Sequence, residues 1–173
     1  SLAALSDIDA PAVDVALATS AAPTYFAAAP FPTHQGASYV DGGVWANCPA
    51  LAGVVEAVSF LQVPLQEIDL LSIGTTTQPF NIAQHRDSGI AEWNAGLIEL
   101  LFEAQVQATL AQTGLLLHGR LHRIDFTARP GEFTLDDARP EKIEQLINLG
   151  RGEAVKKANR DAVMTRFLNG QPA

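Results

Sequence analysis

The sequence predicts an α/β fold, with a three-layer α/β/α arrangement around a mostly parallel central sheet. The first observation is the segment 67–74 (EIDLLSIG), an apolar run of the kind found in strands that are covered on both faces. The second is the order strand, helix, strand over residues 39–74, which predicts a right-handed βαβ unit. The third is the length of 173 residues, which fits one domain with a sizeable core.

The first part of the chain predicts a helix, an irregular connection and a short strand. Residues 13–22 are small and apolar, which suits a helix packed close to a sheet, and Pro23 ends that helix. The connection 23–38 is rich in proline, which argues against a strand because proline lacks a backbone N–H. The segment 38–43 (SYVDGG) then predicts a short strand that stops at its glycines.

Two helices are predicted on either side of the apolar strand. Pro49 opens the first helix at the N1 position, which tolerates a missing N–H, and Asn47 serves as its cap. The second helix covers residues 88–114, where apolar residues recur at helical spacing and Gly114 ends the helix.

The last part of the chain predicts one strand and one helix. Alternating apolar residues over 115–126 favour a strand. A helix begins at about Pro140, and Gly150 and Gly152 leave open a kink or a break in it. No linker and no second domain are indicated.

The composition excludes some classes of function. The formal net charge is −8, which makes nucleic acid an unsuitable partner because phosphate binding needs a basic face. Cys48 is the only cysteine, so no internal disulfide can form. A reducing cytosol fits, although a secreted protein without disulfides would look the same. No apolar run approaches the ~20 residues that span a bilayer. We therefore expect a cytoplasmic location.

Asp41 is the first candidate for a functional residue. It lies at the end of the short predicted strand, and ligands of open parallel sheets bind beyond the carboxyl ends of strands. Gly42 and Gly43 can adopt backbone angles that other residues avoid, and they leave room for a substrate. The alternative is an Asp-Gly hairpin turn. A predicted helix follows instead of a second strand, so the functional interpretation is slightly favoured.

Three blocks of sequence resemble the patatin-like phospholipase family. They are ATSAAPTYF (18–26), YVDGGVWANCPALAGVVEA (39–57) and IDLLSIGTTT (68–77), in the order that the family has them. The remainder, from about residue 78, matches the family only in outline. The resemblance implies that residues 1–173 form the C-terminal part of a single patatin-like domain.

The resemblance also implies an activity, that of a lipid acyl hydrolase with a serine–aspartate dyad. Asp41 matches the family's aspartate, which takes the proton of the serine, while Gly42, Gly43 and Trp45 belong to the substrate site. A free aspartate has a pKa of ~3.9 and is a weak base, so the serine must lie within ~2.6–3.2 Å of it. The implied substrate is a lipid or phospholipid, and neither a cofactor nor a metal is implied.

The sequence departs from the family in one important respect. It contains no G-x-S-x-G elbow and no G-G-G-x-[RK]-G oxyanion turn, which precede the first block in the family. We expect both in a missing N-terminal half of the domain, upstream of Ser1. Ser20 and Ser38 are not candidate nucleophiles because neither lies in an elbow, and Cys48, where the family often has asparagine, is interpreted as a small apolar residue. The alternative is a non-catalytic binding or assembly module that retains only the back half of the fold.

Several surface features leave two interpretations open. Trp45 lines an acyl pocket or packs under the helix that follows it. The apolar loop 26–32 (FAAAPFP) meets a membrane surface or is buried. A late basic cluster is a solvated helix end or docks on anionic lipid; it consists of Lys156, Lys157, Arg160 and Arg166. A peripheral contact with a membrane is therefore expected alongside the cytoplasmic location.

Two further motifs are given their simpler interpretations. The segment 74–77 (GTTT) follows a strand and lacks the lysine and second glycine of a phosphate-binding loop, which favours a strand-end turn. His118 and His122 are four residues apart, a spacing that binds zinc on a helix. Gly119 and the alternation around it favour a strand, so we interpret both histidines as ordinary strand or edge residues.

Overall fold

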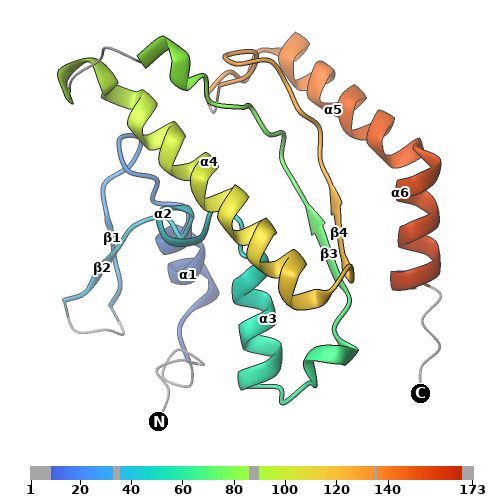
Figure 1. Cartoon of the computed structure of the whole chain (residues 1–173). Coiled ribbons are helices and arrows are strands. Elements are labelled where there is room, and N and C mark those ends of the chain that lie inside the picture. Colours follow the sequence, from blue (N-terminus) through green and yellow to red (C-terminus); the bar gives the residue numbers. More distant parts are fainter. Residues whose placement is uncertain (1–8, 33–35, 86–89, 135, 169–173) are drawn as a thin grey trace. The chain divides into compact units, whose positions relative to one another are not determined.

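A computed structural model describes residues 9–32, 36–85, 90–134 and 136–168 of the chain, with side chains outside 84–96 (Figure 1). It divides into two compact units, Ser1–Cys48 and Pro49–Ala173. The α/β class is confirmed, since both units combine helices with strands. The described strands form two separate pairs, not one central sheet, so the three-layer arrangement stays a prediction. No described helix has the length and apolar character needed to cross a membrane.

The first unit begins with helix α1 (Ala12–Thr19), which starts one residue before the predicted range 13–22 and ends within it. The helix ends at Ser20, whose hydroxyl donates a hydrogen bond back to the carbonyl of Ala16 at 2.7 Å. Such back-bonding competes with the next backbone bond, and Pro23 follows soon after. The chain therefore leaves the helix slightly earlier than the apolar pattern indicated.

A short antiparallel pair follows, formed by β1 (Ala29–Pro30) and β2 (Ser38–Tyr39). The prediction of a connection without a strand was wrong at this point. Pro30 is tolerated because the adjacent ladder bond comes from the N–H of Phe31, which donates to the carbonyl of Ala37 at 3.0 Å. The buried ring of Phe31 packs 5.0 Å from that of Tyr39, which holds the two strands together.

The strand pairs within the two units do not include the βαβ unit predicted over residues 39–74, which stays a prediction. Among the described residues β2 pairs with β1, whereas β3 (Leu70–Ile73) pairs with β4 (Leu121–Ile124). The physical reason is local, because β2 stops after Tyr39 and the N–H of Asp41 bonds to the carbonyl of Ala21. That bond belongs to a turn and not to a ladder with a further strand.

The second unit contains the parallel pair. Figure 1 shows β3 and β4 side by side, and their register places Leu70 opposite Leu121 and Ile73 opposite Ile124. Parallel strands need a long crossover, which helix α4 (Ile90–Leu117) supplies. The apolar run at 67–74 therefore does form a parallel strand, although a shorter one than predicted.

The core of this unit lies on one face of the pair. Val54 of helix α3 (Ala50–Ser59), Ile68 and Leu117 are buried together, and Leu70 and Leu121 pack against them. Successive strand residues point to opposite faces. Ile73 and Ile124 accordingly line a hollow on the other face, with Leu146 and Leu149 of helix α5 (Pro140–Val155).

The end of α4 differs from the prediction. Gly114 does not stop the helix, which continues to Leu117 and ends at His118 and Gly119, with φ of 47° and 87°. Left-handed residues of this kind terminate helices. A Cβ at Gly114 would meet only the side chain of Leu121, at 4.0 Å, which is an ordinary van der Waals contact. Residues 115–117 are consequently helical, and the strand predicted from 115 begins only at Leu121.

Two helix starts can be compared. The N-cap of α3 is Pro49, which was predicted as its N1 residue. Asn47, predicted as the N-cap of α3, is instead the C-cap of the one-turn helix α2 (Gly43–Ala46). The start of α5 at Pro140 is confirmed. The glycines of α5 do not interrupt it, and the break comes at Lys156, before helix α6 (Lys157–Ala162) and a π-helical turn, Val163–Leu168.

Candidate active site

Asp41 is held between the antiparallel pair and helix α2 by two hydrogen bonds. Its N–H donates to the carbonyl of Ala21 at 2.9 Å, and its Oδ1 accepts the N–H of Gly43 at 2.6 Å. The first bond joins the turn after α1 to the strand end, so two sequence blocks about 20 residues apart meet at this residue. Two hydrogen bonds, one from the backbone N–H and one to a carboxylate oxygen, thus hold the half-buried Asp41 in place.

The two oxygens of the Asp41 carboxylate differ. Oδ1 is occupied by the Gly43 N–H. Among the residues that the structure describes, none donates a hydrogen bond to Oδ2. A carboxylate that is oriented through one oxygen and open at the other can accept a proton from a group placed beside it.

The glycines after Asp41 are required for space and not for unusual backbone angles. Gly42 has φ −59° and ψ −22°, and neither glycine is among those with positive φ, so the predicted conformational role is wrong. A Cβ on Gly42 would lie 3.3 Å from the Oγ1 of Thr19. A Cβ on Gly43 would lie 3.1 Å from the Oδ1 of Asp41. Both distances are tighter than ordinary van der Waals contact, so a side chain would displace its neighbour.

Gly43→Ala is expected to lower the ester hydrolysis that the family resemblance implies, by about 10- to 100-fold in the full-length protein, with the fold retained. The added methyl group pushes on the very oxygen that the Gly43 N–H holds, and small misplacements of a catalytic group have effects of this size. The measurement is ester turnover alongside thermal melting. Gly53→Ala in α3 is the matched control, because a Cβ there meets nothing within 4 Å. Equal turnover of the two variants would contradict the role of this contact.

The other candidate residues of the first unit are not brought onto the Asp41 carboxylate by any described bond. Trp45, in α2, is 78% exposed. The hydroxyl of Ser20 is engaged with α1, and Ser38 is an exposed residue of β2. Cys48 is buried at 5% exposure, which agrees with its interpretation as a small apolar residue.

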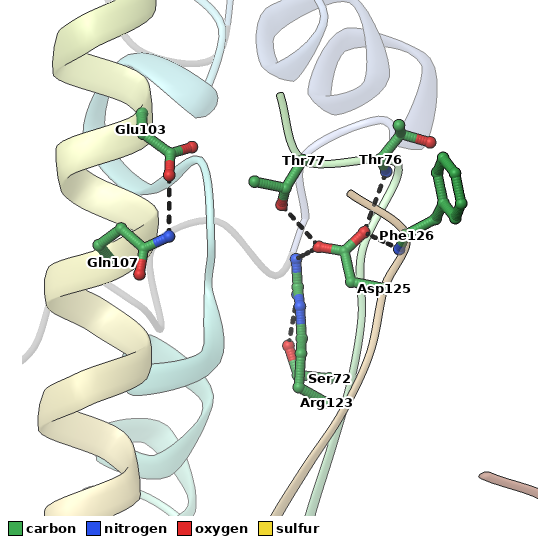
Figure 2. A network of polar contacts seen from close by, with 8 residues as sticks. All are labelled: Ser72, Thr76, Thr77, Glu103, Gln107, Arg123, Asp125 and Phe126. Atoms are coloured by element: carbon green, nitrogen blue, oxygen red, sulfur yellow. Dashed lines mark hydrogen bonds and ion pairs between the residues drawn. The ribbon is translucent and has the colours of Figure 1, made fainter. Parts of the chain in front are cut away.

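A second polar constellation lies at the carboxyl ends of β3 and β4 (Figure 2). Arg123 donates to the Oγ of Ser72 at 2.7 Å and to the Oδ2 of Asp125 at 2.7 Å. Asp125 also accepts the hydroxyl of Thr77 at 2.8 Å and the backbone N–H of Thr76 and Phe126, at 3.2 and 2.9 Å. Four hydrogen bonds thus converge on the Asp125 carboxylate and tie together segments about 50 residues apart.

This network explains the GTTT segment. The N–H groups of Gly74 and Thr77 donate to the carbonyls of Ile124 and Phe126, and that of Thr76 donates to Asp125, so a carboxylate of the chain already occupies the turn. The strand-end turn is confirmed in place of an anion-binding loop. Burial by itself raises the pKa of Asp125, but the hydrogen bonds from Thr77 and Arg123 and the Arg123 charge lower that pKa below its ordinary value.

A hollow of about 310 Å³ lies beside this network, between the strand ends and α5. Apolar side chains form most of its wall, together with the carboxylates of Asp125 and Glu153. Both carboxylates are already paired, Asp125 with Arg123 and Glu153 with Lys156 at 2.5 Å. The hollow therefore offers apolar contact, with its charged groups engaged inside the protein.

The two histidines do not lie on a common element. His118 is in the turn after α4, and His122 is in β4 with its Nε2 buried and without a hydrogen-bond partner. Both lie outside a helix, and the prediction that both lie on a strand is wrong for His118, which precedes β4. Within the described ranges no three histidine, cysteine or carboxylate residues come close enough together to hold a metal ion.

Some residues that build these sites were missed from the sequence. Thr19 and Ala21 lie in a recognised block, but no pattern indicates that they contact Gly42 and Asp41. Arg123 and Asp125 are two residues apart, a spacing that places side chains on the same face of a strand. The sequence could have indicated this ion pair only through that spacing. Its partners 50 residues away leave no sequence signal.

Comparisons with known proteins agree with the sequence blocks. A family model described as patatin-like phospholipase matches residues 5–54. Proteins named cGAMP-activated phospholipase are similar over most of the chain. That of Pseudomonas aeruginosa (strain BWHPSA011 / Pa011) is 31% identical over 154 residues, which are 87% of this chain and 44% of the relative.

Two further relatives carry the same name. The protein of Escherichia coli (strain TW11681) is 40% identical over 160 residues, covering 80% of this chain and 44% of the relative. That of Vibrio cholerae serotype O1 (strain ATCC 39315 / El Tor Inaba N16961) is 26% identical over 175 residues, covering 90% and 49%. The chain thus spans about half the length of the curated relatives it matches.

Proposed function

The chain belongs to a patatin-like family, and from this premise we propose that it forms part of a phospholipase, a lipid acyl hydrolase that cleaves carboxylic esters of phospholipids. In this proposal Asp41 is the base of a serine–aspartate dyad. The serine and the oxyanion donors come from a part of the protein outside residues 1–173. Gly42 and Gly43 shape the site, and Trp45 contacts the substrate.

The proposal is carried by the geometry of Asp41. The hydrogen bond from Gly43 orients the carboxylate through Oδ1, which leaves Oδ2 for the proton of an attacking serine. A carboxylate is a weak base toward an alcohol, so it works only if the serine is held in contact with it and water is excluded. The anchoring of Asp41 to Ala21 supports this requirement, because it limits the movement of the base.

Two features of the protein's setting complete the proposal. Its relatives are named for activation by cGAMP, and we extend this regulation to the present protein as a proposal. Phospholipid substrates reside in bilayers, so the protein is proposed to act from the cytoplasm in peripheral contact with a membrane.

The decisive experiment uses the natural full-length protein with phospholipid vesicles, with and without cGAMP. We expect release of free fatty acid, and covalent labelling of one serine by a fluorophosphonate probe, because the dyad activates that serine as a nucleophile. Mass spectrometry of the labelled peptide identifies the residue. Absence of both fatty acid release and labelling under both conditions would instead support a non-catalytic binding or assembly module.

A further inference from the structure

A second hollow of about 310 Å³ lies within the second unit, between the loop before α5 and residues 145–149 of that helix. This Phe133 hollow is lined by an aromatic ring, a carboxylate, two amides and one leucine, namely Phe133, Glu132, Gln145, Asn148 and Leu149. We propose that it binds the base of a guanine nucleotide. The proposed activator cGAMP carries such a base, but the inference does not depend on the proposed hydrolysis, since none of these residues belongs to the Asp41 site.

The loop that forms one wall of the Phe133 hollow is held in place by the protein itself. Gln78 forms two hydrogen bonds with the backbone of Phe133: its Nε2 donates to the carbonyl at 2.8 Å, and its Oε1 accepts the N–H at 3.2 Å. The N–H of Glu132 donates to the carbonyl of Arg129 at 3.1 Å, and the N–H of Arg129 donates to the Oε2 of Glu132 at 2.9 Å. A wall that is ordered in advance lowers the entropy that ligand binding must overcome.

The polar groups of the Phe133 hollow retain bonding capacity for a ligand. Oε2 of Glu132 is occupied by the Arg129 N–H, but no described residue donates a hydrogen bond to Oε1. Gln145 and Asn148 are three residues apart on α5, and their amides form no hydrogen bond with the residues that the structure describes. A carboxylate only accepts hydrogen bonds, whereas an amide both donates and accepts. The matching ligand therefore presents N–H donors to Glu132 and both donors and acceptors to the amides.

Guanine matches this set of groups better than the other bases do. Its N1–H and N2–H donors are adjacent on one edge and can both face a carboxylate, while its O6 and N7 accept from amides. Adenine and cytosine place an unprotonated ring nitrogen on that edge, which a carboxylate oxygen repels. Bases recognised singly also stack on aromatic side chains, and Phe133 supplies a ring in the wall.

Lys142 supplies the positive charge that the phosphate of a nucleotide requires. Its Nζ donates to the backbone carbonyl of Glu132 at 2.9 Å and lies 5.0 Å from the centroid of the Phe133 ring. A carbonyl does not neutralise the ammonium charge, and the carboxylate of Asp137 is bonded to Arg139 at 2.7 and 2.6 Å. A lysine of this kind binds phosphate as a point charge. In this proposal the base stacks on the ring face opposite Lys142, and the phosphate lies toward the ammonium group.

The other hollow of this unit, beside Asp125, is a poorer site for a base. Its wall is mostly apolar, and its two carboxylates are paired with Arg123 and Lys156. A buried base whose N–H groups find no acceptor loses the hydrogen bonds that it makes with water. We therefore assign the nucleotide to the Phe133 hollow.

The test is isothermal titration calorimetry of the natural full-length protein with GMP, AMP and inorganic phosphate. We expect GMP to bind at least about tenfold more tightly than AMP, a discrimination that one good pair of hydrogen bonds to a base provides. Inorganic phosphate should bind more weakly than either nucleotide, because it lacks a base.

Glu132→Gln should weaken GMP binding by about tenfold or more, with AMP affected less. The new side chain keeps one oxygen for the Arg129 N–H and turns its NH₂ group toward the donors of guanine, so the loop is retained and the base is repelled. Glu144→Gln is the matched control, because it makes the same chemical change at an exposed position of α5 that does not line the hollow. The control should bind GMP like the wild type, and both variants should melt close to it.

Equal affinity of Glu132→Gln and the wild type for GMP, no preference for GMP over AMP, or phosphate binding as tight as that of GMP would each overturn the inference. If Glu132→Gln does not fold, Asn148→Ala takes its place, since this exposed side chain makes no described bond and its loss should weaken GMP binding severalfold. Unchanged GMP affinity of that variant would overturn the inference as well. Fatty acid release reports separately on the proposed function: a protein that binds GMP but hydrolyses no ester contradicts only the hydrolysis, and one that hydrolyses phospholipid but does not bind GMP contradicts only the nucleotide site.

Discussion

Asp41→Asn is expected to lower ester hydrolysis by about 10²- to 10⁴-fold in the full-length protein, the range that a general base contributes. The asparagine side chain retains an oxygen that can accept the N–H of Gly43, which now holds Oδ1 at 2.6 Å. The anchoring bond from the Asp41 N–H to Ala21 is a backbone bond and is unaffected. The substitution therefore removes the proton acceptor and leaves the local structure in place.

The measurement is the initial rate of fatty acid release, together with the melting temperature. Asp14→Asn is the matched control, because it makes the same chemical change on α1 of the same unit. We expect the control to retain wild-type turnover and both variants to melt close to the wild type. Full activity of Asp41→Asn would remove Asp41 from the role of base, whatever the family resemblance.

Gly74→Ala is expected to destabilise the protein by about 3 kcal/mol, at the upper end of the range for overpacking. A Cβ at this position would overlap the carboxylate of Asp125 and the guanidinium of Arg123. Neither group can move freely, since Asp125 accepts bonds from Thr77 and two backbone N–H groups besides Arg123. Gly74 itself is bonded through its N–H to Ile124 at 2.8 Å.

Urea unfolding of the two variants and the wild type measures this effect. Gly152→Ala in α5 is the control, because a Cβ there meets nothing within 4 Å and alanine favours a helix by roughly 0.5–1 kcal/mol over glycine. The control should thus be neutral or slightly more stable. Equal unfolding midpoints for Gly74→Ala and the wild type would show that the Asp125–Arg123 network accommodates the added methyl group without a loss of stability.

The parts of the fold that follow from local chemistry could be predicted from the sequence. The apolar run around β3 and the helix start at Pro140 were predicted correctly because burial and the missing proline N–H act within a few residues. Strand partners and helix ends were not predicted correctly. The strand β2 pairs with a strand that contains a proline, and Gly114, which was expected to end a helix, lies inside it. Pairing and helix ends depend on neighbours that a local pattern does not contain.

The sequence by itself determined the family and pointed to Asp41 through the order and spacing of three blocks. Only the tertiary structure decided why two glycines follow it: one leaves space for Thr19 and the other for the Asp41 carboxylate, while their backbone angles are ordinary. Only the structure located the Arg123–Asp125 pair against Gly74. The physical reason is that these contacts form between residues that are distant in the chain and meet only when it folds. Such contacts produce no periodic pattern in the sequence.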